Sequence, residues 1–197
     1  SLFDLRPDTA YELELHLVDP DGLDVTRTVT GRTAPVPSDP PAPRAVAVTN
    51  QTTLNAALGS AQPGDVITLA NGTYGPISIN RGGAAGNPLV IRGESQAGVI
   101  LDGANCACNV IELYTSSWVH LENLTIRNAQ RAVKVQTTGT NHNVFRRLVV
   151  TDVTLGITAN ADADSYYVAD NVIAGRLVWP AVYSDDSGAH ANDDGIH

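Results

Sequence analysis

The sequence has little positive charge, few aromatic side chains and no long apolar run. Its 197 residues include 12 Lys or Arg against 21 Asp or Glu, for a net charge of −9, and Lys134 is the single lysine. So few cations argue against a nucleic-acid-binding surface. No apolar run approaches the ~20 residues of a membrane-spanning helix, and no signal peptide is present. With aromatics at only 5%, a core has to come from Val, Ile, Leu and Ala, which favours stacked short strands.

Cysteine is also scarce, and the two that occur, Cys106 and Cys108, are separated by one residue. A disulfide across one residue would be strained, and a zinc site would need further ligands. We therefore expect two reduced cysteines that behave as small apolar side chains.

Residues 1–34 alternate apolar and polar side chains on either side of a turn at 19–22, which predicts an antiparallel hairpin. The spacing of Leu5, Pro7, Thr9 and Tyr11 resembles the tyrosine corner of a fibronectin type III domain. Since the early strands of that sandwich are missing, we expect a partial domain that is disordered or leans on its neighbour.

A linker and a helix follow this first segment. Residues 35–44 are half proline, which predicts a semi-rigid extended linker. Apolar residues at helical spacing predict a helix over 53–61, with Thr52 or Thr53 as its N-cap. Short apolar strands are expected next, at Val66–Leu69, Ile77–Ile79, Leu89–Ile91, Val99–Leu101 and Val110–Leu113.

A repeat then emerges along the chain. Apolar positions recur at offsets of 24 and 23 residues: Leu121, Leu124 and Ile126, then Phe145, Leu148 and Val150, then Val168, Asn171 and Ile173. A second set recurs at offsets of 22 and 24 residues: Ile111–Leu113, Val133–Val135 and Ile157–Ala159. Such spacing is typical of a right-handed parallel β-helix, in which coils stack because one coil cannot bury its apolar face alone. Asn128 and Asp152 fall at equivalent turns.

The predicted fold class is therefore all-β. Residues 45–197 would form the first coils of a parallel β-helix with the helix as its N-terminal cap, after a truncated β-sandwich fragment. The alternative is a β-sandwich made from the same strands. It would need tight hairpin turns, and no Asn-Gly or Asp-Gly turn joins two equal alternating strands after residue 103.

Residues 51–103 carry a family resemblance. The strings PGDVITLANGTY at 63–74, NPLVIRG at 87–93 and VILDG at 99–103 resemble the opening coils of right-handed β-helix proteins of the pectate lyase-like superfamily. They are most similar to polysaccharide lyases of the alginate lyase and chondroitinase B type. The resemblance implies a secreted or surface-bound bacterial lyase that cleaves uronic-acid polymers by β-elimination, with an active site on a later coil.

We expect this chain to be a monomeric fragment that ends about five coils in and is inactive alone. Two alternatives stay open: a β-helical glycoside hydrolase resembling polygalacturonases, and a non-catalytic adhesin-like β-helix.

The resemblance also implies catalytic candidates. β-Elimination needs a neutralised C6 carboxylate, a base for the C5 proton and an acid for the leaving oxygen. Lyases of this kind often use Lys and Arg together, so Lys134 and Arg147 are candidates. Arg146 and Arg147 are neighbours on one predicted strand and should point to opposite faces, so that at most one faces a groove. The competing interpretation is that these charges are solvated.

The last residues of the chain are rich in carboxylates. Asp185, Asp186 and Asp193 are candidate ligands of Ca²⁺. Asp194 lies in the string NDDGIH at 192–197, which is similar to the N-x-D-G string of polygalacturonases, where an Asp is a catalytic acid.

Two aromatic residues in the same region could bind substrate. Trp179 and Tyr183 are candidates for stacking on the sugar rings of a polysaccharide. Trp118 and Tyr167 sit just before equivalent strands, so a flank of the β-helix is an equally good place for the aromatic side chains.

Overall fold

The computed structural model describes residues 4–137, 139–159, 164–176 and 194–196. The chain forms two compact units, residues 1–38 and 39–197. No helix in these described ranges is long and apolar enough to cross a membrane.

The first unit contains a hairpin of two antiparallel strands, β1 (Ala10–Val18) and β2 (Asp24–Arg32). The hydroxyl of Tyr11 accepts a hydrogen bond of 2.7 Å from the backbone amide of Arg6. A tyrosine corner makes a contact of this kind. The segment therefore forms the predicted hairpin, while its relation to fibronectin domains stays a prediction.

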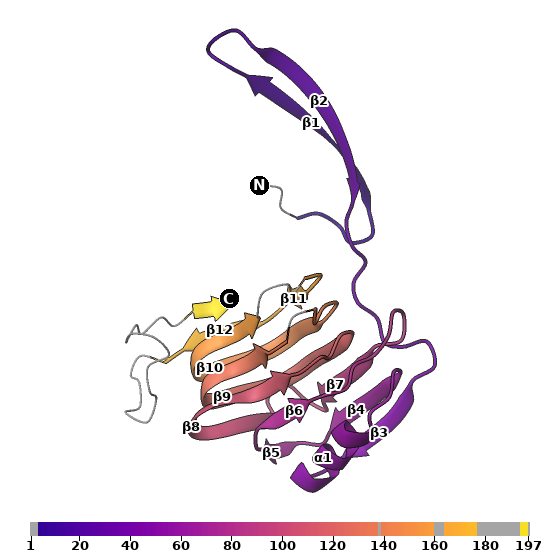
Figure 1. The fold of residues 1–197 in the computed structure, drawn as a ribbon, viewed down its shortest axis with the longest axis vertical. Coiled ribbons are helices and arrows are strands. Elements are labelled where there is room, and N and C mark those ends of the chain that lie inside the picture. Colours follow the sequence, from indigo (N-terminus) through magenta and orange to yellow (C-terminus); the bar gives the residue numbers. More distant parts are fainter. Residues whose placement is uncertain (1–3, 138, 160–163, 177–193, 197) are drawn as a thin grey trace. The chain divides into compact units, whose positions relative to one another are not determined.

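The second unit is a stack of coils in which every pair of described strands is parallel, as Figure 1 shows. Its strands are β3 (Arg44–Val48), β4 (Asp65–Leu69), β5 (Gly72–Tyr74), β6 (Ile77–Ile79), β7 (Leu89–Gly93), β8 (Val99–Leu113), β9 (Val119–Val135), β10 (Val144–Ala159), β11 (Tyr167–Ala169), β12 (Val172–Gly175) and β13 (Asp194–Ile196). Parallel pairing excludes the β-sandwich, which is built from antiparallel hairpins.

The long strands β8, β9 and β10 bend around the stack, so that each contributes to more than one of its faces. Face A consists of β3, β4, β7, the starts of β9 and β10, and β11. Face B consists of β5, the start of β8, the middle parts of β9 and β10, and β12. Face C consists of β6, the ends of β8, β9 and β10, and β13.

The register confirms the repeat seen in the sequence. Leu121 pairs with Phe145, and Phe145 pairs with Val168. Ile126 pairs with Val150 in the same way on face B, and Leu124 pairs with Leu148 two residues earlier on the same strands. Asn171 continues the row by hydrogen bonding, since its side chain accepts from the Leu148 amide and donates to the Phe145 carbonyl at 2.9 Å. The inward side chains thus form one buried apolar column.

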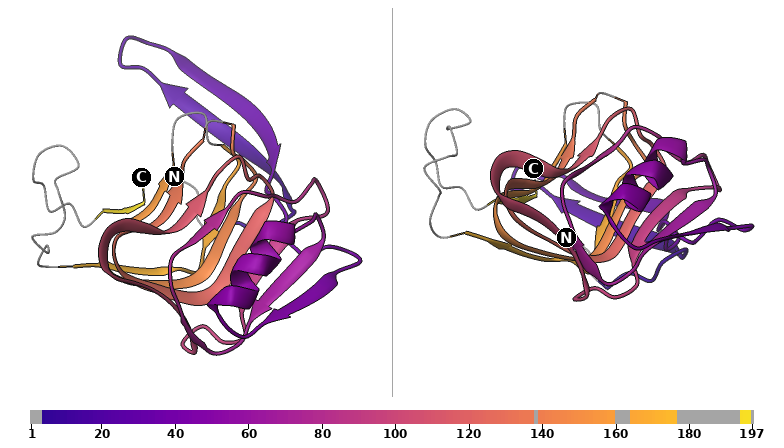
Figure 2. Two further views of the ribbon diagram at one scale, coloured as in Figure 1. Left: turned by 60° about the horizontal axis from the view of Figure 1, so that its bottom comes forward. Right: turned by 90° about the horizontal axis from the view of Figure 1, so that it is seen from below.

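The helix α1 (Gln51–Ser60) packs against the first coil, as Figure 2 shows. Leu54 and Leu58 are buried and close the end of the column. The predicted N-cap was wrong: Asn50 caps the helix, and Thr53 is its third residue. The Asn50 side chain accepts from the Thr53 amide at 2.9 Å, and the Thr53 hydroxyl accepts from the Asn50 amide at 3.2 Å. This capping box explains the earlier start of the helix.

The prediction of two reduced cysteines was also wrong, because Cys106 and Cys108 form a disulfide. Their Cα atoms are 5.1 Å apart, within the range that a disulfide spans. The backbone is irregular here: Ala104 and Asn105 have positive φ angles, and the register between β8 and β9 shifts on both sides of Cys106. This local bulge brings the two sulfur atoms together.

Candidate functional site

A row of polar side chains runs across face C, one from each coil. Ser78 pairs with Glu112, Glu112 with Lys134, and Lys134 with Thr158. The residues that flank this row along each strand, such as Ile111 and Val133, are buried in the column. Since side chains alternate along a strand, the row points away from the column. Ser78 is exposed, Glu112 and Lys134 are half-buried, and Thr158 is buried. Face C therefore carries a regularly spaced polar row that contains two titratable side chains, Glu112 and Lys134.

Glu112 is held by neutral hydrogen-bond donors. It accepts hydrogen bonds from Asn109, from the Tyr114 hydroxyl at 2.9 Å and from the Gln136 amide at 3.1 Å. Burial by itself would raise the pKa of Glu112, but these bonds, together with one from Ser78, lower it below its usual value. Glu112 is thus an ionised carboxylate of fixed orientation at neutral pH.

Lys134 is the next group in the row and is half-buried. Its pKa is lowered, first by burial and then by the positive charge of Arg131. No carboxylate within the described ranges forms an ion pair with its ammonium group. A lysine with a lowered pKa has a larger neutral fraction at neutral pH, which is what a general base requires.

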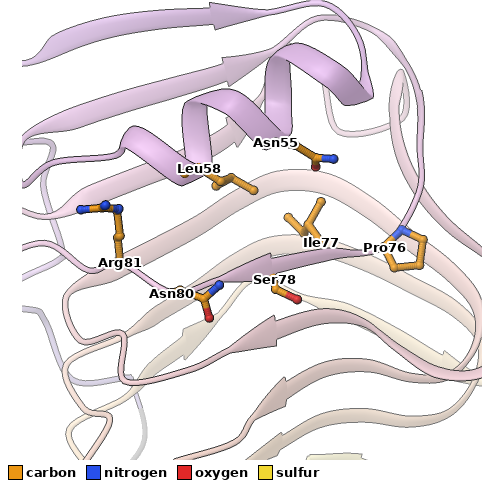
Figure 3. A pocket seen from close by; sticks show the side chains of 8 residues that line it. Asn55, Leu58, Pro76, Ile77, Ser78, Asn80 and Arg81 are labelled. Carbon is orange, nitrogen blue, oxygen red and sulfur yellow. The ribbon is translucent and has the colours of Figure 1, made fainter.

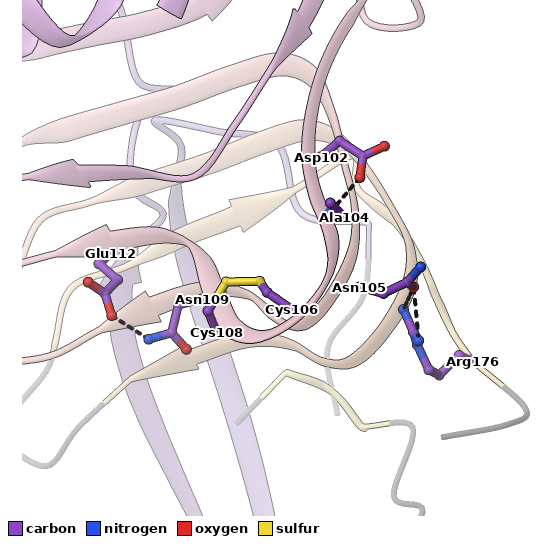
Figure 4. The surroundings of a disulfide bond; sticks show 8 residues. All are labelled: Asp102, Ala104, Asn105, Cys106, Cys108, Asn109, Glu112 and Arg176. Carbon is purple, nitrogen blue, oxygen red and sulfur yellow. Dashed lines mark hydrogen bonds between the residues drawn. A yellow bond between two sulfur atoms is a disulfide. The ribbon is translucent and has the colours of Figure 1, made fainter. Parts of the chain in front are cut away.

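A hollow of about 430 Å³ opens beside this row, between β6 and the disulfide loop. It is lined by Pro76, Ile77, Ser78, Ala107, Cys108, Asn109 and Glu112. Figure 4 shows the disulfide, Asn109 and Glu112 side by side on this stretch of β8. The disulfide therefore shapes one wall of the hollow beside the candidate site.

Arg147, the second catalytic candidate, lies elsewhere. It stands at the corner between faces A and B, with a φ of 53°, and its guanidinium donates to the Glu122 carboxylate at 2.8 Å. The structure therefore does not bring Arg147 and Lys134 together, since Lys134 lies on face C.

The expectation that Arg146 and Arg147 point to opposite faces was wrong. Arg146 also contacts Glu122, with Nη2 2.8 Å from Oε1. The positive φ of Arg147 breaks the strict alternation of a strand, so that both guanidinium groups reach one carboxylate. Glu122 is fully buried, and the cluster around it is a packed ion-pair network.

Asp194 lies on the same face as Lys134. It begins β13 and pairs with Leu155, which pairs with Arg131. Its side chain lies outside the described residues. The remaining candidates also lie outside them: Trp179, Tyr183, Asp185, Asp186 and Asp193. Within the ranges that the structure describes, no group of three or more His, Cys, Asp or Glu side chains could hold a metal ion.

Sequence reasoning missed Glu112 and Arg131 as members of this site. The signal for Glu112 was available, because the repeat aligns Glu112 with Lys134. Arg131 carried no such signal, because it lies three residues before Lys134 on the same strand and not at an equivalent position of another coil. Its effect is to lower the pKa of Lys134.

Comparison with known proteins gives a family for the coils. A family model described as chondroitinase B matches residues 48–167. A search of curated proteins found no match.

Solved structures share the fold. The alginate lyase from Paenibacillus sp. str. FPU-7 is 20% identical with a TM-score of 0.60, over 64% of this chain and 43% of that chain. The PL6 family alginate lyase AlyGC is 17% identical with a TM-score of 0.54, over 64% of this chain and 19% of that one. The chain therefore spans less than half the length of either structure, and the likeness shows a common parallel β-helix.

Proposed function

The chain belongs to the chondroitinase B family, and on this basis we propose that it is part of a lyase that cleaves uronic-acid polysaccharides by β-elimination. The matched residues 48–167 include most of face C. The alginate lyases that share the fold support a uronate substrate. The same family membership favours the lyase over the hydrolase and the adhesin.

One observation carries the proposal: two cations, Lys134 and Arg81, lie on or beside face C. In residues 39–197, arginines paired with described carboxylates are Arg44, Arg92, Arg127, Arg146 and Arg147. Lys134 and Arg81 form no ion pair with any carboxylate in the described ranges. Lys134 lies on face C, and Arg81 comes two residues after the end of its first strand, β6. A polyuronate would find available positive charge there, on a chain whose net charge is −9.

In the proposed reaction Lys134 is the base. Its amine takes the C5 proton of a uronate, the C5–H electrons form a double bond between C4 and C5, and the bond from C4 to the glycosidic oxygen breaks. That oxygen takes up a proton from an acid. The lowered pKa of Lys134 and the neighbouring charge of Arg131 support this role.

Calcium stays a prediction that rests on Asp185, Asp186 and Asp193. Ca²⁺ would neutralise the C6 carboxylate of the substrate. The described residues of face C do not fit the ion, because Glu112 is a lone carboxylate engaged by neutral donors and Ca²⁺ takes roughly 6–8 oxygen ligands.

Export from the cytoplasm is part of the proposal. Disulfides persist in oxidising compartments and are rare in the cytosol. The Cys106–Cys108 bridge supports a secreted or surface location.

The test is the ultraviolet absorbance of the unsaturated product, measured with the full-length protein on several uronate polymers. Lys134→Gln should lower the rate by about 100-fold or more, the range seen for a lost general base. Arg27→Gln, which removes one exposed charge from the hairpin, is the matched control and should leave the rate unchanged. A chelator arm tests the calcium prediction. Absence of product on every polymer would refute the lyase.

A further inference from the structure

A second hollow, of about 650 Å³, lies between the capping helix α1 and β6. Figure 3 shows the side chains that line it. They are Asn55, Leu58, Gly59, Pro76, Ile77, Ser78, Asn80 and Arg81. Leu58 and Ile77 are buried, so the exposed side chains of Asn55, Ser78, Asn80 and Arg81 form most of its surface. Exposed amide, hydroxyl and guanidinium groups are hydrogen-bond partners for the hydroxyls of a sugar.

Arg81 gives this hollow its chemical preference. It is exposed, it follows β6 by two residues, and it forms no ion pair with a carboxylate in the part of the chain that the structure describes. In Figure 3 its guanidinium lies beside the C-terminal end of α1. A guanidinium group binds a carboxylate through two parallel hydrogen bonds, so a uronate fits this position better than a neutral sugar.

The two hollows are joined along β6. Pro76, Ile77 and Ser78 line both of them. From Ser78 the row on face C continues through Glu112 to Lys134. Neighbouring strands are about 4.8 Å apart, so Ser78 and Lys134 are separated by roughly 10 Å across the strands. A polymer lying across the strands would meet Lys134 and Arg81 with different sugar units.

We propose that the hollow between α1 and β6 is a binding subsite for a uronate unit distant from the cleaved bond, with Arg81 as the residue that recognises its carboxylate. This inference rests on the proposed function, because it places the same polymer along face C. It assigns the capping helix a part in substrate binding as well as in closing the apolar column. The subsite would matter for long substrates and be left empty by short ones.

The test is calorimetric binding of the full-length protein, carrying Lys134→Gln so that the polymer is not cleaved, to a polyuronate and to a uronate disaccharide. In this background Arg81→Gln is compared with the control Arg27→Gln. Arg81→Gln should weaken polymer binding by roughly tenfold or more, the effect of a lost charge-assisted hydrogen bond. Disaccharide binding should be unchanged. Arg81→Lys, which keeps the charge and loses the planar fork, should weaken polymer binding by an intermediate factor.

The outcomes separate the inference from the proposed function. If the protein with Arg81 intact binds no uronate polymer, the proposed function fails and the inference fails with it. If polymer binds and Arg81→Gln binds it as tightly as Arg27→Gln does, the inference alone is overturned. Equal weakening for polymer and disaccharide also overturns it, because Arg81 would then contact the sugar nearest the reaction. Equal melting temperatures of the variants show that α1 is still packed, so that any loss reflects the ligand.

Discussion

Removing the Glu122 carboxylate should destabilise the β-helix more than any other single charge change in the described residues. Glu122 is fully buried on face A. Its oxygens lie 2.8 Å from Nη2 of Arg146 and 2.8 Å from Nη2 of Arg147, and Nη2 of Arg92 is 4.0 Å away. Without the carboxylate, the like charges of these arginines would face one another around a buried position.

The expected magnitude follows from the burial of the pair. Breaking a buried ion pair by removing one partner costs about 3–5 kcal/mol, because the other charge is left uncompensated. For a unit of this size, each kcal/mol corresponds to a shift of about 2–4 °C, so Glu122→Ala should lower the melting temperature by roughly 6–20 °C. Glu122→Gln keeps the volume and one acceptor and should cost less than Glu122→Ala.

The assay is thermal unfolding followed by circular dichroism at neutral pH, with the exposed residue Glu14 changed to Gln as the control. The two arginines provide an internal comparison. The Arg146 side chain is 12% exposed and that of Arg147 is 48% exposed, so Arg146→Gln should cost more than Arg147→Gln. A loss from Glu122→Ala no larger than that of the control, or the reverse order of the two arginines, would refute the reasoning.

Three further predictions concern stability. The hydrogen bond from Arg44 lowers the pKa of Asp65, so this pair stabilises the fold above pH ~4 and its contribution is lost as pH falls. In urea unfolding, the free energy of unfolding of Asp65→Asn should therefore decrease less on acidification than that of the unchanged protein. Asn143→Ala leaves the buried amide of Val119 and the buried carbonyl of Ser116 without their hydrogen-bond partner. It should lower the free energy of unfolding by about 2–4 kcal/mol in the same assay, and an unchanged value would contradict these two hydrogen bonds. Replacing Cys106 and Cys108 by Ser should lower the free energy of unfolding by less than about 2 kcal/mol, because the loop that the disulfide closes is short. If a thiol reagent labels these cysteines before a reductant is added, the disulfide is disproved.

The fold was largely predictable because the repeat is local information repeated along the chain. Leu121, Phe145 and Val168 recur at nearly equal offsets, and stacking is the arrangement that buries all of them at once. The same alignment placed Lys134 over Glu112 on one face. The N-cap was less predictable, since Asn50 and Thr53 are both good capping residues and the structure uses them together.

The sequence by itself therefore determined the parallel stack, its apolar column and the capping helix, because these depend on periodic burial. Only the tertiary structure decided which charges meet. Arg147 adopts a positive φ at a corner where sequence predicts a straight strand, and so joins Glu122 instead of Lys134. The disulfide depends on a backbone bulge in the same way. Side chains alternate between the two faces of a strand only while the strand stays regular. Where the strand bends at a corner, contacts with the neighbouring coils set the direction of its side chains.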